Sequence, residues 1–181
     1  MPDRTVYLGI VCCIGLLVGL PTGLRADQSF ETRIEGTWEA TTSDAKAREK
    51  IDGEIDELVA KMFFFKRPFA RSQLREATQP CSTIRIELGD DDVTMQCDDR
   101  QPTPSPKDGS PTDWTSADGE TYTLTQHVKS DRVVQTFDSG NGVRTNTYRL
   151  KDADTLVLDV ELDSDQLPEP LTFERTFERA E

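Results

Sequence analysis

The sequence predicts a mainly β fold, an antiparallel β-barrel of about eight strands with a helical segment inserted after the first strand. From residue 81 onward, apolar and polar residues alternate in short runs separated by turn-forming residues, which is typical of antiparallel strands. Residues 43–80 instead carry apolar residues at spacings of three and four, as an amphipathic helix does. The length of 181 residues and the apolar fraction of 35% indicate one domain with a modest core.

Residues 1–26 predict a secretory signal peptide. An apolar run of fifteen residues, 6–20, follows an arginine and ends in proline and glycine, and the small residue Ala26 precedes the expected cleavage point. The alternative is an uncleaved N-terminal membrane anchor, because residues 5–24 are nearly long enough to span a bilayer. Cleavage leaves residues 27–181 as the barrel domain, secreted or periplasmic.

The cysteines predict one disulfide. Cys12 and Cys13 lie inside the signal peptide, in the middle of the apolar run, which argues against lipidation. Cys81 and Cys97 are left as an even pair in an oxidising compartment, and a bond between them would contribute about 3 kcal/mol by closing a loop. A metal site needs more ligands than this pair and His127 supply, so neither metal nor cofactor is expected.

Charge and composition exclude several functions. The chain has 21 Lys and Arg against 34 Asp and Glu, a net charge of -13, which repels nucleic acid and anionic lipid headgroups alike. Neither nucleic acid nor, after signal cleavage, a membrane is therefore an expected partner. The single histidine, His127, alternates with threonines on the polar face of its strand, and no Gly-x-Ser-x-Gly turn accompanies it. The chain is not expected to be an enzyme, and no catalytic residue is assigned.

The first strand and the helix follow the signal peptide. Phe30 to Ala40 shows period-two alternation through Ile34, Gly36 and Trp38, which predicts a strand. Ser43 or Asp44 caps a helix that should run to about Phe65. Its apolar face consists of Ile51, Ile55, Leu58 and Met62.

The second half of the insert contains an unusual aromatic triplet. Phe63, Phe64 and Phe65 are consecutive and cannot share one helix face, so we expect them to plug an opening in the fold. Pro68 should break the helix, with a further turn or two from Phe69 to Glu76.

A β-hairpin should follow Pro80, from Ser82–Leu88 and Val93–Cys97. Pairing Leu88 with Val93 would place Cys97 across from Ile84, not Cys81. The disulfide therefore needs a bulge or must tie the strand to the segment that enters the hairpin. The proline-rich segment 101–113 is expected to be an irregular loop.

The remaining sequence predicts a meander of strands. With a short piece near Trp114, these make eight or nine strands in all, enough to close a barrel. The longer ones are Glu120–Val128, Arg132–Asp138, Val143–Leu150, Thr155–Leu162 and Leu171–Arg179.

Gly36-Thr37-Trp38 on the first strand, a following helix, the meander and a last strand ending Phe177-Glu178-Arg179 together resemble the lipocalins and their calycin relatives. The resemblance implies that Trp38 seals the closed end of the barrel and that Arg179, with Arg175 as the alternative, packs over its ring. The helical insert replaces the long open loop of that family. In this respect the chain is more similar to secreted bacterial lipocalin-like proteins of unassigned function than to the animal carriers.

The resemblance implies non-enzymatic binding of a small hydrophobic ligand, a lipid or fatty-acid-like molecule, in the periplasm or extracellular space. Arg175 lies on the inward face, where its partner could be a ligand carboxylate, a protein carboxylate or water at the barrel rim. The other candidate ligand-binding residues are Tyr122, Tyr148, Val160, Phe173 and Phe177.

The alternative is a barrel filled by its own side chains. Such a protein would act as a structural or protein-interaction domain of the cell envelope, with the 101–113 loop or the helix as its contact surface. Periodicity does not separate the two hypotheses, because it assigns residues to the inward face without showing whether the interior is empty.

Overall fold

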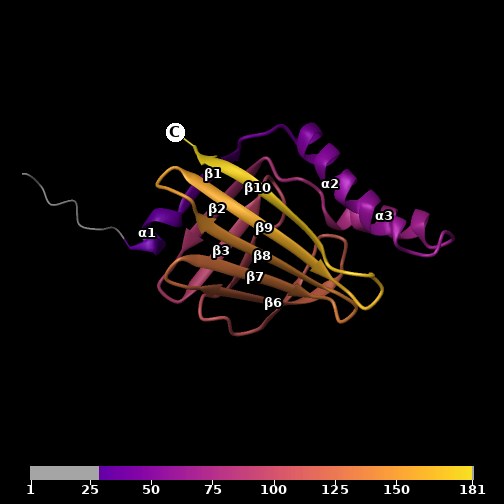
Figure 1. The fold of residues 1–181 in the computed structure, drawn as a ribbon. Helices are drawn as coiled ribbons and strands as arrows, with labels where there is room; N and C mark the ends of the chain where they lie inside the picture. Colours follow the sequence, from indigo (N-terminus) through magenta and orange to yellow (C-terminus); the bar gives the residue numbers. More distant parts are fainter. Residues whose placement is uncertain (1–28, 181) are drawn as a thin grey trace, which may run out of the picture.

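A computed structural model describes residues 29–180 of the chain (Figure 1). The predicted signal peptide, with Cys12 and Cys13, lies outside the described residues. Ten antiparallel strands form a single sheet that curls into a nearly closed barrel. The strands are β1 (Gly36–Ala40), β2 (Thr83–Leu88), β3 (Asp92–Cys97), β4 (Thr103–Pro106), β5 (Thr112–Thr115), β6 (Thr121–Val128), β7 (Arg132–Asp138), β8 (Val143–Leu150), β9 (Thr155–Asp163) and β10 (Leu171–Arg179).

Ten strands, not about eight, make the barrel. The segment 101–113, predicted to be an irregular loop, contains β4 and the beginning of β5. Pro104 and Pro106 led to the loop prediction, because proline has no N–H for a ladder hydrogen bond. The strand β4 lies at the end of the sheet and pairs with β3 alone, so a missing N–H is tolerated there. The expected short piece near Trp114 is the strand β5, which pairs with β6.

Strand order is β4-β3-β2-β1-β10-β9-β8-β7-β6-β5, so β4 and β5 meet at a seam. Side chains, and not a backbone ladder, join the two edges. Gln101 Nε2 donates to the Thr115 carbonyl at 2.8 Å, and Trp114 Nε1 donates to the Pro102 carbonyl at 3.0 Å. Just beyond β4, the Val128 N–H donates to the Lys107 carbonyl at 2.9 Å.

The expected first strand, Phe30 to Ala40, is wrong in its first half. Residues Phe30–Ile34 form the helix α1, and β1 begins only at Gly36. Ser29 caps α1, since its Oγ accepts from the Thr32 N–H at 3.3 Å. Phe30 and Ile34 are both buried at a spacing of four, which fits a helix turn as well as period-two alternation does.

Two helices fill the predicted insert: α2 (Asp44–Ala60) and α3 (Arg67–Ala77). Ser43 caps α2 as expected, accepting from the Lys46 N–H at 3.4 Å. Pro68 lies in the first turn of α3 instead of breaking a helix, because the N–H groups there have no acceptor within the helix. The hairpin of α2 and α3 lies along one side of the barrel and extends beyond it (Figure 1).

The helical hairpin has its own small core. Its inner face packs against the beginning of β10 through six buried residues: Ile51, Ile55, Leu58, Val59, Leu74 and Leu171. The aromatic triplet does not take part. The structure contradicts the prediction that these residues plug an opening, because Phe63, Phe64 and Phe65 are 73%, 79% and 65% exposed at the turn between the helices.

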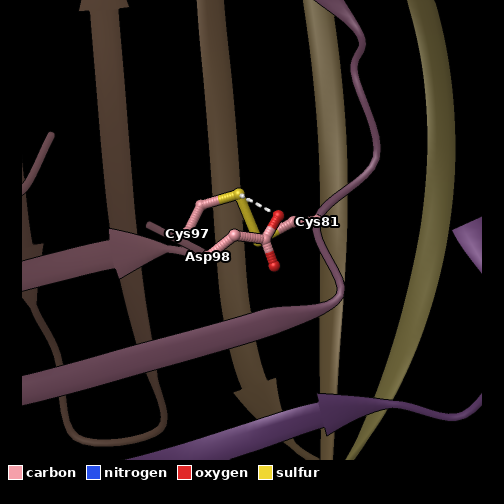
Figure 2. A group of neighbouring side chains, drawn as sticks. All are labelled: Cys81, Cys97 and Asp98. Atoms are coloured by element: carbon pink, nitrogen blue, oxygen red, sulfur yellow. Dashed lines mark hydrogen bonds between the residues drawn. A yellow bond between two sulfur atoms is a disulfide. The ribbon is translucent and has the colours of Figure 1, made fainter. Parts of the chain in front are cut away.

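The β2–β3 hairpin has the predicted register, with Leu88 opposite Val93 and Ile84 opposite Cys97. The predicted disulfide between Cys81 and Cys97 is confirmed, with Cα atoms 5.6 Å apart. It ties the end of β3 to the segment that enters β2, which is one of the two expected arrangements (Figure 2).

Candidate functional site: the barrel interior and its mouth

Trp38 and Arg179, the residues predicted to seal the barrel, are in contact with each other. Trp38 is fully buried and donates from Nε1 to the Ile34 carbonyl of α1 at 2.9 Å. The Arg179 guanidinium lies 4.1 Å from the centre of the Trp38 ring and donates to the carbonyls of Arg33 and Glu35. This is the geometry that the lipocalin resemblance implies.

Gly36 lets this arginine approach the backbone. It has a φ of +130°, and a Cβ at that position would meet Arg179 Nη1 at 2.9 Å. The Gly-x-Trp pattern therefore has a steric cause in this chain: the glycine makes room for the arginine that covers the tryptophan.

A buried polar network crosses the barrel interior. Gln135 Nε2 donates to Thr103 Oγ1 at 2.9 Å and to Gln126 Oε1 at 3.1 Å. Its Oε1 accepts from Asn146 Nδ2 at 2.9 Å and from the Tyr148 hydroxyl at 3.2 Å. Every hydrogen-bonding position of the Gln135 amide is thus occupied.

Gln126 links this network to the other side of the seam. Its Nε2 donates to the Thr103 carbonyl at 2.6 Å, to Ser105 Oγ at 2.9 Å and to the Val93 carbonyl at 3.3 Å. Sequence reasoning missed the network, although Gln126, Gln135 and Asn146 share the inward parity of their strands with apolar residues. That parity is the signal that could have found it.

Arg144 lies on the inner face of β8 at the mouth of the barrel, under α3. Its Nε donates to Asn146 Oδ1 at 2.9 Å, and its Nη1 donates to the Ala77 carbonyl at the end of α3 at 2.8 Å. Within residues 29–180 no carboxylate oxygen lies within 4.0 Å of this guanidinium. Burial lowers the pKa of Arg144, and burial also raises the pKa of nearby Tyr148 to about 12.

Arg175, the predicted ligand-binding arginine, is buried on β10 and has partners from the protein itself. It donates to the Cys81 carbonyl at 2.7 Å and to the Thr42 carbonyl at 3.4 Å, and its Nη2 lies 3.6 Å from Asp44 Oδ1. Burial lowers the pKa of Arg175, and Asp44 opposes this shift. Of the partners that the sequence left open, the structure contains the protein carboxylate.

Most of the other predicted ligand-binding residues lie in the barrel core or in the polar network. Val160 and Phe177 are buried in the barrel core, Tyr148 belongs to the polar network, and Phe173 is half-buried opposite Val160. Tyr122 is in neither. It is half-buried in an aromatic cluster with Trp114 and Phe137, with ring centres 5.5–6.2 Å apart.

Side chains occupy the interior of the barrel. Apolar residues from β1, β2, β3, β7, β8, β9 and β10 meet in one buried cluster, and the polar network lies beside it. Two hollows among the described residues are open to solvent. One lies along Asp91–Asp92 and Pro104–Asp108, and the other crosses β8, β9 and β10 between Thr145 and Glu174.

Cys81, Cys97 and Asp98 form the one group of potential metal ligands found among residues 29–180 (Figure 2). Their chemistry does not fit a metal site, because the two sulfurs are bonded to each other. The Asp98 carboxylate is also engaged, since its Oδ1 accepts from the N–H groups of Ser82 and Thr83 at 2.9 and 2.8 Å. Asp98 has a φ of 51° and fixes the beginning of β2.

His127 is exposed on β6. Within residues 29–180, every helix is too short or too polar to cross a bilayer.

The nearly closed antiparallel barrel, with Arg179 packed over Trp38 at one end, is similar in fold to lipocalin-like barrels. No family model matches the sequence, and no curated protein matches it either. Solved structures do match. The fatty-acid-binding protein 1 of Echinococcus granulosus is 14% identical, with a TM-score of 0.52 over 83% of this chain and 99% of that one.

Two further solved structures are similar at the same level. Lipid binding protein 8 of Caenorhabditis elegans, in its apo form, is 14% identical, with a TM-score of 0.51 over 82% of this chain and 96% of that one. A mutant of the fluorescent protein UnaG is 16% identical, with a TM-score of 0.51 over 83% of this chain and 98% of that one. At these identities the matches show a shared fold.

Proposed function

We propose that the chain binds a small hydrophobic molecule with an anionic head, a lipid or fatty-acid-like ligand, without catalysing a reaction on it. The carrying observation is Arg144: a guanidinium on the inner wall, at the mouth of a barrel, with only neutral partners among residues 29–180. A ligand carboxylate would supply the charge that the protein does not. The predicted signal peptide supports a periplasmic or extracellular place of action.

Apolar side chains around Arg144 could receive the hydrophobic part of such a ligand. Arg144 lies opposite Phe137 on β7 and Leu162 on β9. Both are partly buried; Leu162 packs against the barrel core, and Phe137 packs against Trp114 and Tyr122. An acyl chain entering past these residues would meet Phe173 and Val160 next. Because side chains fill the interior, the ligand must displace some of them, and the half-buried Phe173 and Leu162 are the most readily moved.

The structural neighbours support the same class of ligand. Two of the three solved structures described above are a fatty-acid-binding protein and a lipid binding protein. This similarity concerns the fold, so the ligand is inferred for this chain from Arg144 and its surroundings.

Binding of fatty acids and fatty alcohols of equal length tests the proposal. Arg144→Met should weaken binding of the acid by roughly tenfold or more, since a hydrogen bond to a charged group contributes about 1.5–3 kcal/mol. Binding of the alcohol should change little. Arg149→Met is the matched control, because Arg149 lies on the same strand but faces outward, where it pairs with Asp159 and Glu174.

The measurement is isothermal titration of the delipidated protein, preceded by native mass spectrometry of the protein as purified without detergent. A wild-type protein that carries no small molecule and takes up neither ligand would overturn the proposal. An equal effect of both arginine substitutions would also overturn the role given to Arg144.

A filled barrel is the second candidate, and the complete hydrogen bonding of Gln135 favours it. In that case the protein is a scaffold or interaction domain.

The intact mass of the purified protein would also show whether residues 1–26 are removed or retained as an anchor.

A further inference from the structure

The turn between α2 and α3 presents the most hydrophobic exposed surface of the described chain. Phe63, Phe64, Phe65 and Phe69 are 65–79% exposed, and the only other large apolar residue exposed among residues 29–180 is Val143, at 36%. The Phe65 ring packs against the other two, with centres 6.1 Å apart for Phe63 and Phe65 and 5.8 Å apart for Phe64 and Phe65. We call these four residues the phenylalanine tip.

The charge of this segment is opposite to that of the whole chain. Residues 58–75 contain five Lys or Arg residues and no Asp or Glu, although the chain as a whole carries -13. The net charge of the whole chain predicts repulsion from anionic surfaces, but residues 58–75 carry a local charge of the opposite sign.

Not all of these cations are neutralised within the protein. Within the hairpin, Arg71 pairs with Asp56 at 2.7 Å and Arg75 pairs with Asp52 at 3.1 Å. Lys61, at the end of α2, pairs with Glu169 of the β9–β10 loop at 2.5 Å. Within the described part of the chain, the two cations that directly follow the rings, Lys66 and Arg67, are not paired in this way.

Lys66 and Arg67 directly follow the three rings, and neither has a carboxylate within 4.0 Å among residues 29–180. Arg67 instead donates to the carbonyls of Ala60 and Met62, at 2.8 and 3.0 Å. The tip therefore combines exposed aromatic rings with positive charge that no carboxylate of the described chain balances.

The tip also extends away from the acidic body (Figure 1). The opposite end of α3 contacts the barrel mouth through the Ala77 carbonyl and Arg144. An 11-residue helix is ~16 Å long, about twice the screening length of ~8 Å at physiological salt. Charges at the barrel mouth, at the other end of α3, are thus largely screened from a surface that touches the tip. Glu169, the barrel carboxylate that reaches the tip end of the hairpin, is paired with Lys61.

We propose that the phenylalanine tip docks the protein on an anionic lipid bilayer, with the rings among the acyl chains and Lys66 and Arg67 at the headgroups. Apolar anchors with adjacent cations are what interfacial binding requires. A protein groove that receives a helix would need anchors spaced by three and four residues, whereas three of these rings are consecutive and lie in a turn. This inference is independent of the proposed ligand.

Phe64→Trp provides a reporter at the tip in the full chain. Its added emission, above that of Trp38 and Trp114, should be quenched by vesicles with brominated acyl chains that contain about one quarter phosphatidylglycerol. Vesicles of phosphatidylcholine alone should quench it much less, and so should about 1 M salt. The reporter responds to the tip itself, whatever the N-terminal apolar segment does.

Two variants measure the contributions of the rings and of the charge. The triple variant Phe63→Ser, Phe64→Ser and Phe65→Ser should weaken vesicle binding by at least about tenfold, and Lys66→Glu by roughly tenfold. Lys129→Glu, in the exposed β6–β7 turn, is the matched control and should change it little. Unfolding by urea would verify that each variant is folded.

Two results would overturn the proposal. One is emission from the introduced tryptophan that bromine does not quench, with vesicle binding unchanged in the triple variant. The other is a dimer in solution that the triple variant disperses while vesicles fail to bind, which would assign the tip to a second copy of the chain.

Discussion

Replacing Gln135 with methionine tests whether the polar network in the barrel interior is shielded from water. Methionine has nearly the same length and shape as glutamine but forms none of its four hydrogen bonds. Three buried groups lose their partner in this network: Gln126 Oε1, Asn146 Nδ2 and the Tyr148 hydroxyl. Thr103 keeps its own bond, since its hydroxyl donates to the Met95 carbonyl at 2.9 Å.

The expected cost follows from these three groups. An unsatisfied buried polar group costs about 1–3 kcal/mol, so even the lower value gives about 3 kcal/mol for Gln135→Met. Domains of this size unfold with about 5–15 kcal/mol, so the change removes a large fraction of the stability. In urea, with a slope of about 1.5–2 kcal/mol per molar, the midpoint should fall by about 1.5–2 M.

Urea unfolding followed by circular dichroism is the assay, with Gln96→Met as the control. Gln96 lies on β3 with its side chain at the surface and makes one hydrogen bond, to the Arg100 carbonyl at 3.0 Å, so its replacement should cost about 0.5 kcal/mol or less. A loss below about 1 kcal/mol for Gln135→Met, at unchanged slope, would refute the argument. It would mean that water reaches these groups and that the interior is hydrated.

Three further outcomes are expected. Cys81→Ser with Cys97→Ser should lower the unfolding free energy by about 3 kcal/mol, and reduction of the native protein should produce the same loss; equal urea midpoints would contradict this. Arg179→Met should cost about 2 kcal/mol and shift the fluorescence of Trp38 to longer wavelength, since a cation–π contact and two hydrogen bonds are lost; unchanged emission would refute it. Burial raises the pKa of Tyr148 to about 12, so the unfolded chain releases this proton first, near pH 10, and stability should fall from about pH 10 to 12. Tyr148→Phe should make this fall shallower in urea unfolding measured across that range, and an identical pH profile would contradict the assignment.

The strand pattern could be predicted where alternation is regular. The bounds of β7, β8 and β10 agree with the prediction, because clear turn residues flank β7 and β8 on both sides and precede β10. Alternation failed at Phe30–Ile34, since residues four apart fit both a strand and a helix turn. It also failed at β4, where proline was taken as a breaker although an end strand does not need every N–H.

The candidate site was harder to predict than the fold. Parity correctly assigns Arg175 to the interior, but its partners Cys81 and Asp44 come from segments far away in the sequence. Arg144 and Gln135 were passed over because polar residues on a strand are usually outward-facing. Only the packing of α3 over the mouth makes Arg144 distinctive, and periodicity carries no information about that contact.

The seam between β4 and β5 affects how the protein behaves at high concentration. An open sheet edge can recruit a strand from another molecule and so begin aggregation. Here two of the four residues of β4 are prolines, which have no N–H to offer, and the carbonyls of Pro102, Thr103 and Thr115 already accept bonds from side chains across the seam. Trp114, Gln101 and Gln126 therefore protect the ends of the sheet from intermolecular strand addition while they hold the barrel shut.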